Sequence, residues 1–75
     1  MNLYDCQKGK HYKITQLKTQ DEILKHRLLT MGIYENAIIS ISHTTLTKST
    51  IAVMIGNTQI ALRGNEAKSI EVVAL

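Results

Sequence analysis

The chain has 75 residues with one cysteine, no proline and a formal net charge of +3. A chain of this length buries only about 60% of the surface that its unfolded form exposes, so we expect one domain, residues 1–75, with a thin core. The single Cys6 excludes an intramolecular disulfide, and the absence of a CxxC pair or an HxxxH spacing excludes the common structural zinc patterns.

The first predicted strand follows Gly9, in the run KHYKITQLK. Tyr12 and Ile14 lie two residues apart in it, which is typical of a strand with one buried face. The same quarter of the chain is rich in lysine, and a basic stretch of this kind serves either as a solvated rim or as a contact for phosphate, lipid or an acidic partner. The lysines in question are Lys8, Lys10, Lys13 and Lys18.

A helix is predicted next, from Gln20 to Met31. Thr19 and Glu22 have the spacing of a capping box, in which each side chain satisfies a free backbone N–H at the start of a helix. Gly32 supplies a residue that readily takes the left-handed conformation at a helix end. The apolar positions that share one stripe of this helix are Leu24, Leu28 and Met31.

Strand patterns dominate the rest of the chain. The segment from Ala37 to Ser42 alternates apolar and polar residues, and residues 51–62 read as a hairpin around the turn signal Gly56-Asn57. Asn65 is a candidate cap for one short helical turn, and residues 70–73 form a last strand. About five short strands and one helix favour a mainly β fold, a small SH3-like barrel with the helix inserted after the first strand. The helical stripe would then cover one open end of a barrel too small for an interior pocket.

Catalytic and metal-binding signatures are largely missing. The sequence contains no P-loop, GxGxxG, HExxH or GxSxG, so we do not expect an enzyme. Four residues are acceptable ligands for a transition metal such as Fe²⁺ or Zn²⁺, although their spacing matches no known finger. The alternative is that the cysteine is a small core residue and the histidines are scattered over the surface. These weak metal candidates are Cys6, His11, His26 and His43.

Two binding functions remain open. Small barrels that bind nucleic acids stack bases on aromatic residues, but this chain has only three tyrosines and no Phe or Trp, so that signal is weak. A protein-interaction module fits better, because Leu29 lies about 140° around the helix from Leu24 and falls outside the apolar stripe. It is either an exposed contact residue or buried in a groove that covers both sides of the helix.

Three stretches together carry a resemblance to a known family. The opening pattern of Leu3, Cys6 and Gly9, the segment RLLTMGI, and the segment IALRGNEAKSIEV resemble the FeoA family of ferrous iron transport accessory proteins over nearly the whole chain. Two departures stand out: Glu35-Asn36 replaces the usual Pro-Gly turn, and TLTKST replaces a loop that often carries Gly-Asp-Pro. Because Asn tolerates the left-handed conformation, we expect the turn to survive. The matching positions are Arg27, Leu28, Leu29, Met31, Gly32, Leu62, Arg63, Glu66, Ala67, Ile70 and Val72.

This resemblance implies a cytoplasmic accessory protein that acts with FeoB, a membrane ferrous iron permease, and reaches the inner face of the membrane through that partner. The sequence has no recognisable signal peptide or membrane span, which agrees with this location, and self-association stays open. Arg63 either pairs with a carboxylate of the fold, such as Glu66, or reaches the partner. The candidate docking residues are Arg27, Leu28, Leu29, Met31, Gly32 and Arg63.

Overall fold

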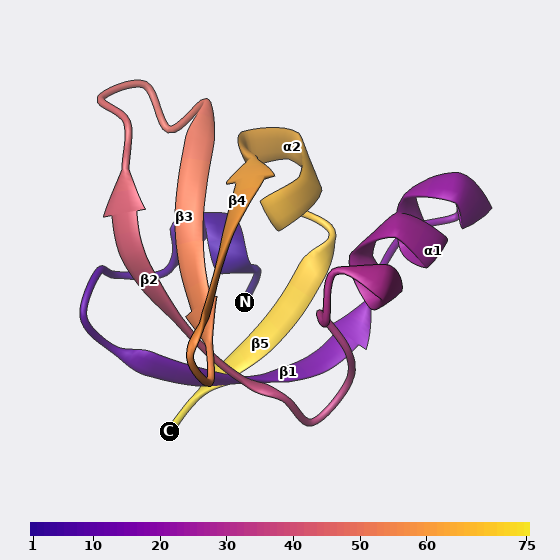
Figure 1. Cartoon of the computed structure of the whole chain (residues 1–75), viewed down its shortest axis with the longest axis horizontal. Helices are drawn as coiled ribbons and strands as arrows, with labels where there is room; N and C mark the ends of the chain where they lie inside the picture. The colour runs from indigo at the N-terminus through magenta and orange to yellow at the C-terminus, as the bar shows by residue number, and fades with distance from the viewer.

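The computed structural model describes the whole chain, residues 1–75, and contains five strands and two helices (Figure 1). A short 3-10 turn, η1 (Leu3–Asp5), which the sequence analysis did not predict, precedes the first strand. The strands are β1 (His11–Leu17), β2 (Ile38–Thr44), β3 (Thr50–Ile55), β4 (Thr58–Arg63) and β5 (Ile70–Ala74). The helices are α1 (Glu22–Thr30), between β1 and β2, and α2 (Gly64–Ala67), between β4 and β5.

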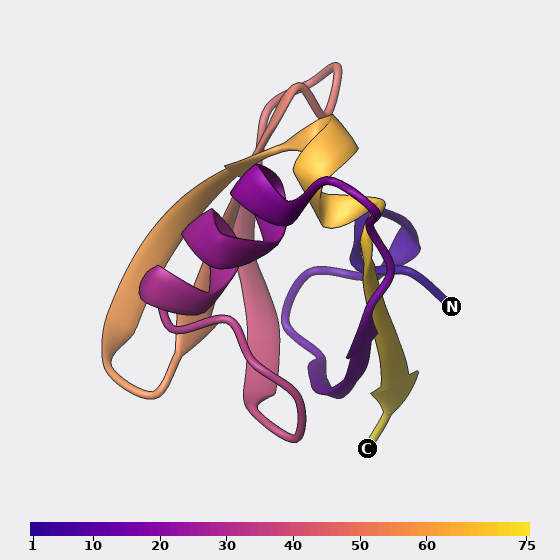
Figure 2. The same cartoon turned by 90° about the vertical axis from the view of Figure 1, so that its right-hand side faces the viewer.

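The strands form one antiparallel sheet in the order β4-β3-β2-β1-β5. The sheet curls on itself, and its two end strands, β4 and β5, are joined by α2 instead of by backbone hydrogen bonds (Figure 1). Figure 2, in which α1 faces the viewer, shows this helix lying over the open side between the β3–β4 hairpin and strands β1 and β5. The predicted fold, a small mainly β barrel with one helix inserted after the first strand, is confirmed.

Strand alternation places the core where the sequence indicated. Ala37, Ile39 and Ile41 are all buried, while Ile38 on the other face of β2 is exposed. The hairpin of β3 and β4 turns at Gly56-Asn57 as predicted, with Gly56 in the left-handed region at φ +60°. Seventeen buried apolar residues form a single cluster, which is the whole core of the domain. A core this small leaves each buried side chain a large share of the stability.

The turn before β2 confirms the expectation for Glu35-Asn36. Asn36 has φ +74°, the left-handed conformation that its short polar side chain tolerates. Its N–H donates to the carbonyl of Ile14 at 2.7 Å, and the N–H of Ile14 donates to the carbonyl of Ala37 at 2.9 Å. The turn is therefore fastened to the middle of β1.

Helix α1 begins at Glu22, two residues after the predicted start, and the predicted capping box is wrong. The N-cap is Asp21, whose Oδ1 accepts the N–H groups of Ile23 at 3.0 Å and Leu24 at 3.2 Å. Thr19 supports this cap from outside the helix, because its hydroxyl accepts the N–H of Asp21 at 3.1 Å. A carboxylate is the stronger acceptor for free helix N–H groups, which explains the shift.

The other end of α1 closes as a Schellman motif around Gly32. With Gly32 at φ +92°, the N–H of Ile33 reaches the carbonyl of Leu28 at 3.0 Å, and the N–H of Gly32 reaches that of Leu29 at 3.1 Å. Ile33 and Leu28 are both completely buried, so the motif also buries its apolar pair. Gly32 thus fixes both the length of α1 and the direction in which the chain leaves it.

Helix α2 begins at Gly64, so the prediction that Asn65 caps it is wrong. The residue before the helix is Arg63, and its backbone N–H is satisfied by Glu66 Oε1 at 2.8 Å. Glu66 is only 4% exposed and is the only charged side chain in the interior. A buried carboxylate requires partners, and these partners define the site described below.

Candidate functional site on helix α1

Helix α1 is seated on the barrel by one apolar stripe. Leu28 is completely buried, and Leu24 and Met31 are partly buried against the core cluster. The predicted lid role of this stripe is confirmed. It also corrects the candidate docking set, because a completely buried Leu28 cannot touch a partner.

An ion pair is the second attachment of α1. Arg27 Nη1 donates to Glu66 Oε2, so the carboxylate of α2 bridges α1 and the end of β4. The guanidinium of Arg63 takes no part in any ion pair, so of the two alternatives for this residue, the one in which it pairs with a carboxylate of the fold is wrong. The sequence signal was misassigned because Arg63 lies three residues from Glu66, whereas Arg27 lies 39 residues away and reaches it only through the fold.

Leu29 points away from this anchored side of the helix. Its side chain is 46% exposed although Leu28, its neighbour in sequence, is completely buried. At about 100° per residue, Leu29 lies about 140° around the helix from Leu24 on one flank, and Arg27 lies about 60° from Leu24 on the other flank. The alternative in which a groove buries both sides of α1 is therefore wrong, and Leu29 is available for contact.

The flank of α1 that carries Arg27 faces a groove toward α2. A cavity of about 240 Å³ opens there, with Ile23 and Leu24 on one side and Arg63 and Asn65 on the other. The Arg27–Glu66 pair also lines it. Ile23 is an apolar residue with 83% of its surface exposed. The sequence did not single it out as a candidate contact residue, because it lies off the apolar stripe and next to the polar N-terminus of the helix. Two candidate docking residues are therefore on opposite sides of α1. Leu29 lies on the flank away from the groove, and Arg63, at the end of β4, lies across the groove from the other flank.

The metal candidates do not come together. No three His, Cys, Asp or Glu side chains lie close enough to hold a metal ion. His11, His26 and His43 are exposed on β1, α1 and β2, respectively. Cys6 is buried in the core cluster, and its thiol donates to the carbonyl of Asn2 at 3.4 Å. Burial raises the pKa of the Cys6 thiol, which favours the neutral form over the thiolate that binds metals. Cys6 is therefore a core residue, as the alternative reading held.

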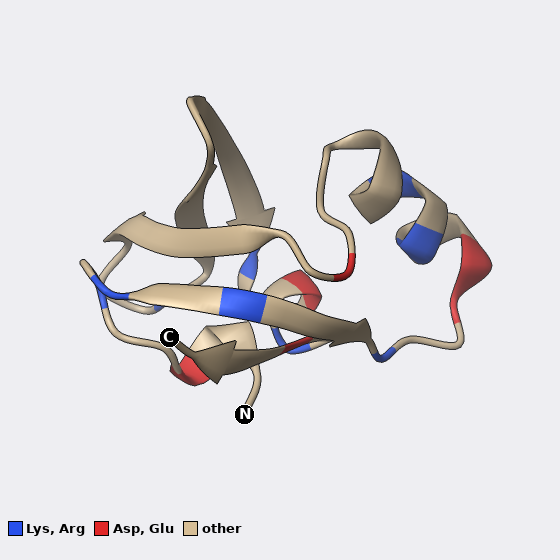
Figure 3. Cartoon of the chain, turned by 90° about the horizontal axis from the view of Figure 1, so that it is seen from below, with Lys and Arg blue, Asp and Glu red and all other residues tan.

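Positive charge is distributed around the molecule. Figure 3 shows basic segments on β1, on α1 and in the connecting loops, with acidic segments between them. Only Lys18 among the four N-terminal lysines forms an ion pair, with Glu71 at 3.4 Å. None of the helices is both long and apolar enough to cross a membrane.

Comparison with known proteins decides the family. The FeoA domain model matches residues 1–74. The chain belongs to the FeoA family. An Fe(2+) transport protein A of Helicobacter pylori strain J99 is 37% identical over 68 residues, which are 91% of this chain and 87% of that protein.

Solved structures agree with the fold of this FeoA protein. The solution structure of iron(II) transport protein A from Clostridium thermocellum has a TM-score of 0.92 and 31% identity, and it covers all of this chain and 46% of that one. FeoA of Stenotrophomonas maltophilia complexed with zinc is described as a prokaryotic SH3 domain protein. It has a TM-score of 0.84 at 20% identity, covering 97% of this chain and 89% of that one, and supports the SH3-like architecture.

Proposed function

We propose that this FeoA protein is a cytoplasmic, non-catalytic accessory subunit of ferrous iron transport, which docks through α1 on the cytoplasmic part of a FeoB-type permease and modulates iron uptake. The family membership and the names of its relatives support a role in ferrous iron transport. Docking on the permease is the further step, and the surface of α1 is its physical basis.

The observation that carries the proposal is the contrast between two adjacent leucines. Leu28 is completely buried and holds α1 in place, whereas Leu29 keeps 46% of its side chain in water. A half-exposed leucine on a helix that is fixed at its N-cap, at its Schellman motif and by an ion pair to a buried carboxylate is a pre-organised contact. Burying such a side chain in a partner contributes roughly 1–3 kcal/mol.

Arg63 and Ile23 extend this contact surface across the α1–α2 groove. The guanidinium of Arg63 is free of ion pairs, and Arg side chains with free donors are common anchors at protein interfaces. Leu29 lies on one flank of α1, and Arg63, at the end of β4, lies across the groove from the other flank. A partner that touches both residues would therefore contact both sides of the helix. If the partner contacts only one side of the helix, its binding would depend on only one of these two residues, Leu29 or Arg63.

Titration of the permease's cytoplasmic part with this protein tests the proposal. We expect Leu29→Ala to weaken binding by about tenfold. Leu46→Ala is the matched control, because Leu46 is a fully exposed leucine in the β2–β3 loop, away from α1. Undiminished binding by both Leu29→Ala and Arg63→Ala would remove this surface from the docking site, and absence of binding by the unmodified chain would refute the partner.

A further inference from the structure

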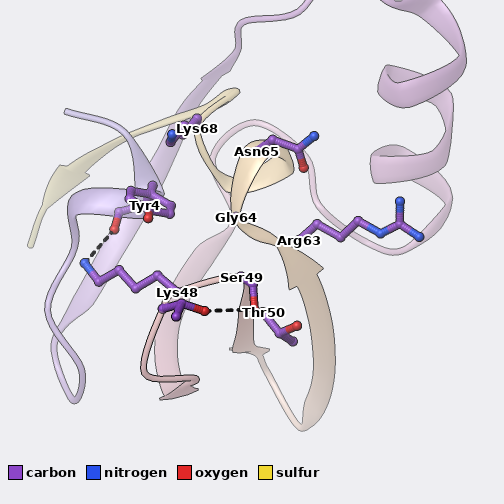
Figure 4. Close-up of a pocket in the computed structure, with 9 residues that line it drawn as sticks. Tyr4, Lys48, Ser49, Thr50, Arg63, Gly64, Asn65 and Lys68 are labelled. Carbon is purple, nitrogen blue, oxygen red and sulfur yellow. Dashed lines mark hydrogen bonds between the residues drawn. The ribbon is translucent and has the colours of Figure 1, made fainter.

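A second cavity, of about 460 Å³, lies where the β2–β3 loop meets α2 and the N-terminal turn (Figure 4). Three of the nine residues around it are Lys or Arg, four carry a hydroxyl group, one carries an amide, and none is acidic. The lining therefore offers positive charge and hydrogen-bond donors with no carboxylate to oppose them. Its residues are Tyr4, Thr47, Lys48, Ser49, Thr50, Arg63, Gly64, Asn65 and Lys68.

The charges around this cavity are not neutralised within the protein. The three ion pairs of the structure use the N-terminal amine, Lys18 and Arg27, and none involves a cation of this cavity. Lys48 Nζ donates one hydrogen bond, to the carbonyl of Tyr4 at 3.1 Å, which leaves two of its three N–H groups free. Positive charge that no carboxylate compensates favours the binding of an anion at the cavity.

The ring of Tyr4 contacts two of these cations, which approach it from different sides (Figure 4). Lys48 Nζ lies 5.1 Å and Lys68 Nζ 4.6 Å from the ring centroid, within the range of a cation–π contact (Figure 4). Because the ammonium groups occupy the ring, it is not free to stack on a base. This arrangement favours recognition of a small oxyanion over recognition of a nucleobase.

The backbone around the cavity is closely packed. A Cβ added to Gly64 would lie 2.5 Å from the carbonyl oxygen of Lys48 and 3.0 Å from the Tyr4 ring, so only glycine fits there. The N–H of Gly64 also donates to the carbonyl of Ser49 at 3.0 Å. Lys48 itself has φ +55°, a conformation that a lysine rarely adopts without such support. The backbone that carries Lys48 is therefore held in place by its contact with Gly64.

We propose that this cavity binds a phosphate-class oxyanion, such as pyrophosphate or the phosphate groups of a nucleotide. The charges of Lys48 and Lys68 would attract the anion, and the free N–H groups of either ammonium would donate to its oxygens. Arg63 borders the site, because in Figure 4 its side chain extends toward α1 and away from the two lysines. The site uses the TLTKST loop and lies apart from Leu29, and Arg63 is the one residue that it shares with the surface proposed for docking.

The test is an NMR titration of the ¹⁵N-labelled chain with inorganic phosphate, pyrophosphate and ADP at constant ionic strength. We expect saturable shifts at the amides of residues 47–50 and 64–68. The double variant Lys48→Gln, Lys68→Gln should bind pyrophosphate at least about tenfold more weakly, because it removes the charge-assisted hydrogen bonds. Lys25→Gln is the matched control, because Lys25 is an exposed lysine of α1 away from the cavity, and it should change the affinity for pyrophosphate by less than about twofold. Stronger binding of ADP than of pyrophosphate identifies a nucleotide as the source of the phosphate groups, and the reverse identifies the free anion.

Three results would overturn the proposed site. The first is shifts that do not saturate or that are scattered over all lysines. The second is a loss of affinity in Lys25→Gln equal to that of the double variant, and the third is tighter binding of a glutamate-rich peptide than of pyrophosphate at the same amides. If the double variant unfolds, two measurements still test the site. One is the map of shifts on the unmodified chain, and the other is the charge-conserving variant Lys68→Arg, which should retain binding. Docking on the permease is measured separately, and the two lysine substitutions should leave it unchanged.

Discussion

The buried carboxylate of Glu66 joins three elements of the fold: it pairs with Arg27 of α1, accepts the backbone N–H of Arg63 at the end of β4, and itself belongs to α2. Apart from this pair, the seat of α1 depends on the stripe around Leu28. The orientation of the proposed docking helix thus depends on this stripe together with a polar contact between residues 39 positions apart.

Substitution of either partner of this ion pair should destabilise the protein. Glu66→Gln keeps an acceptor for the Arg63 N–H but loses the charge, and we expect the free energy of unfolding to fall by roughly 1–3 kcal/mol. Arg27→Gln should cost a similar amount, because it leaves a buried carboxylate without its cation, although half of the Arg27 side chain is exposed and water screens part of the effect. Urea denaturation of both single variants and the double variant measures the coupling. Strict additivity of the two losses would contradict the pairing.

The adjacent leucines should behave in opposite ways in stability measurements. Leu28→Ala removes a completely buried side chain and should lower the free energy of unfolding by about 2–5 kcal/mol. Leu29→Ala should change it by less than about 0.5 kcal/mol, because the side chain already lies partly in water. Thermal or urea denaturation compares the two directly. An equal loss in both variants would mean that Leu29 belongs to the core.

Gly32 should be sensitive to substitution through its backbone alone. Its φ of +92° disfavours any residue with a Cβ, although a Cβ there would meet nothing within 4 Å. We expect Gly32→Ala to cost about 1–2 kcal/mol and Gly32→Asn to cost less, since Asn tolerates positive φ better. Chemical denaturation of the two variants tests this order. A larger loss for Asn than for Ala would point to a steric cause instead.

Cys6 should make the protein less stable in alkaline solution. Burial raises the pKa of its thiol in the folded state above the ordinary value of 9.0, so the folded state favours the neutral form. The associated stability is present below the pKa of the unfolded state and is lost as the pH rises above it, because the unfolded chain then releases the proton more readily. Cys6→Ala should therefore lose less stability between neutral pH and pH of about 10 than the unmodified protein does. Parallel pH profiles of the two proteins would contradict this account.

The fold was predictable from the sequence because its signals are local. Alternation from Ala37 to Ile41, the turn at Gly56-Asn57 and the glycine stop at Gly32 each depend on neighbouring residues, and each is confirmed. The helix start was misplaced because Thr19 and Asp21 offer competing caps within two residues of each other, and only the geometry shows that the Asp21 carboxylate accepts the helix N–H groups.

The candidate site was less predictable because it depends on contacts between distant segments. Pairing of Arg63 with Glu66 was one of two alternatives for that arginine, but the ion pair belongs to Arg27, which the fold brings across from α1. The exposure of Leu29 followed from helical geometry, whereas that of Ile23 and the convergence of Lys48 and Lys68 on Tyr4 required the tertiary structure. Residues that converge from separate elements leave no pattern along the chain.

The docking surface can be located most directly by NMR mapping of the ¹⁵N-labelled chain as the unlabelled cytoplasmic part of the permease is added. We expect the amides of residues 29–32 to shift or broaden first, together with those near Arg63 if the partner contacts both sides of α1. Leu29→Ala should reduce these changes, and Leu46→Ala should not. Perturbations confined to the β2–β3 loop or the outer strands, with α1 unchanged, would contradict the proposal that α1 presents the docking surface.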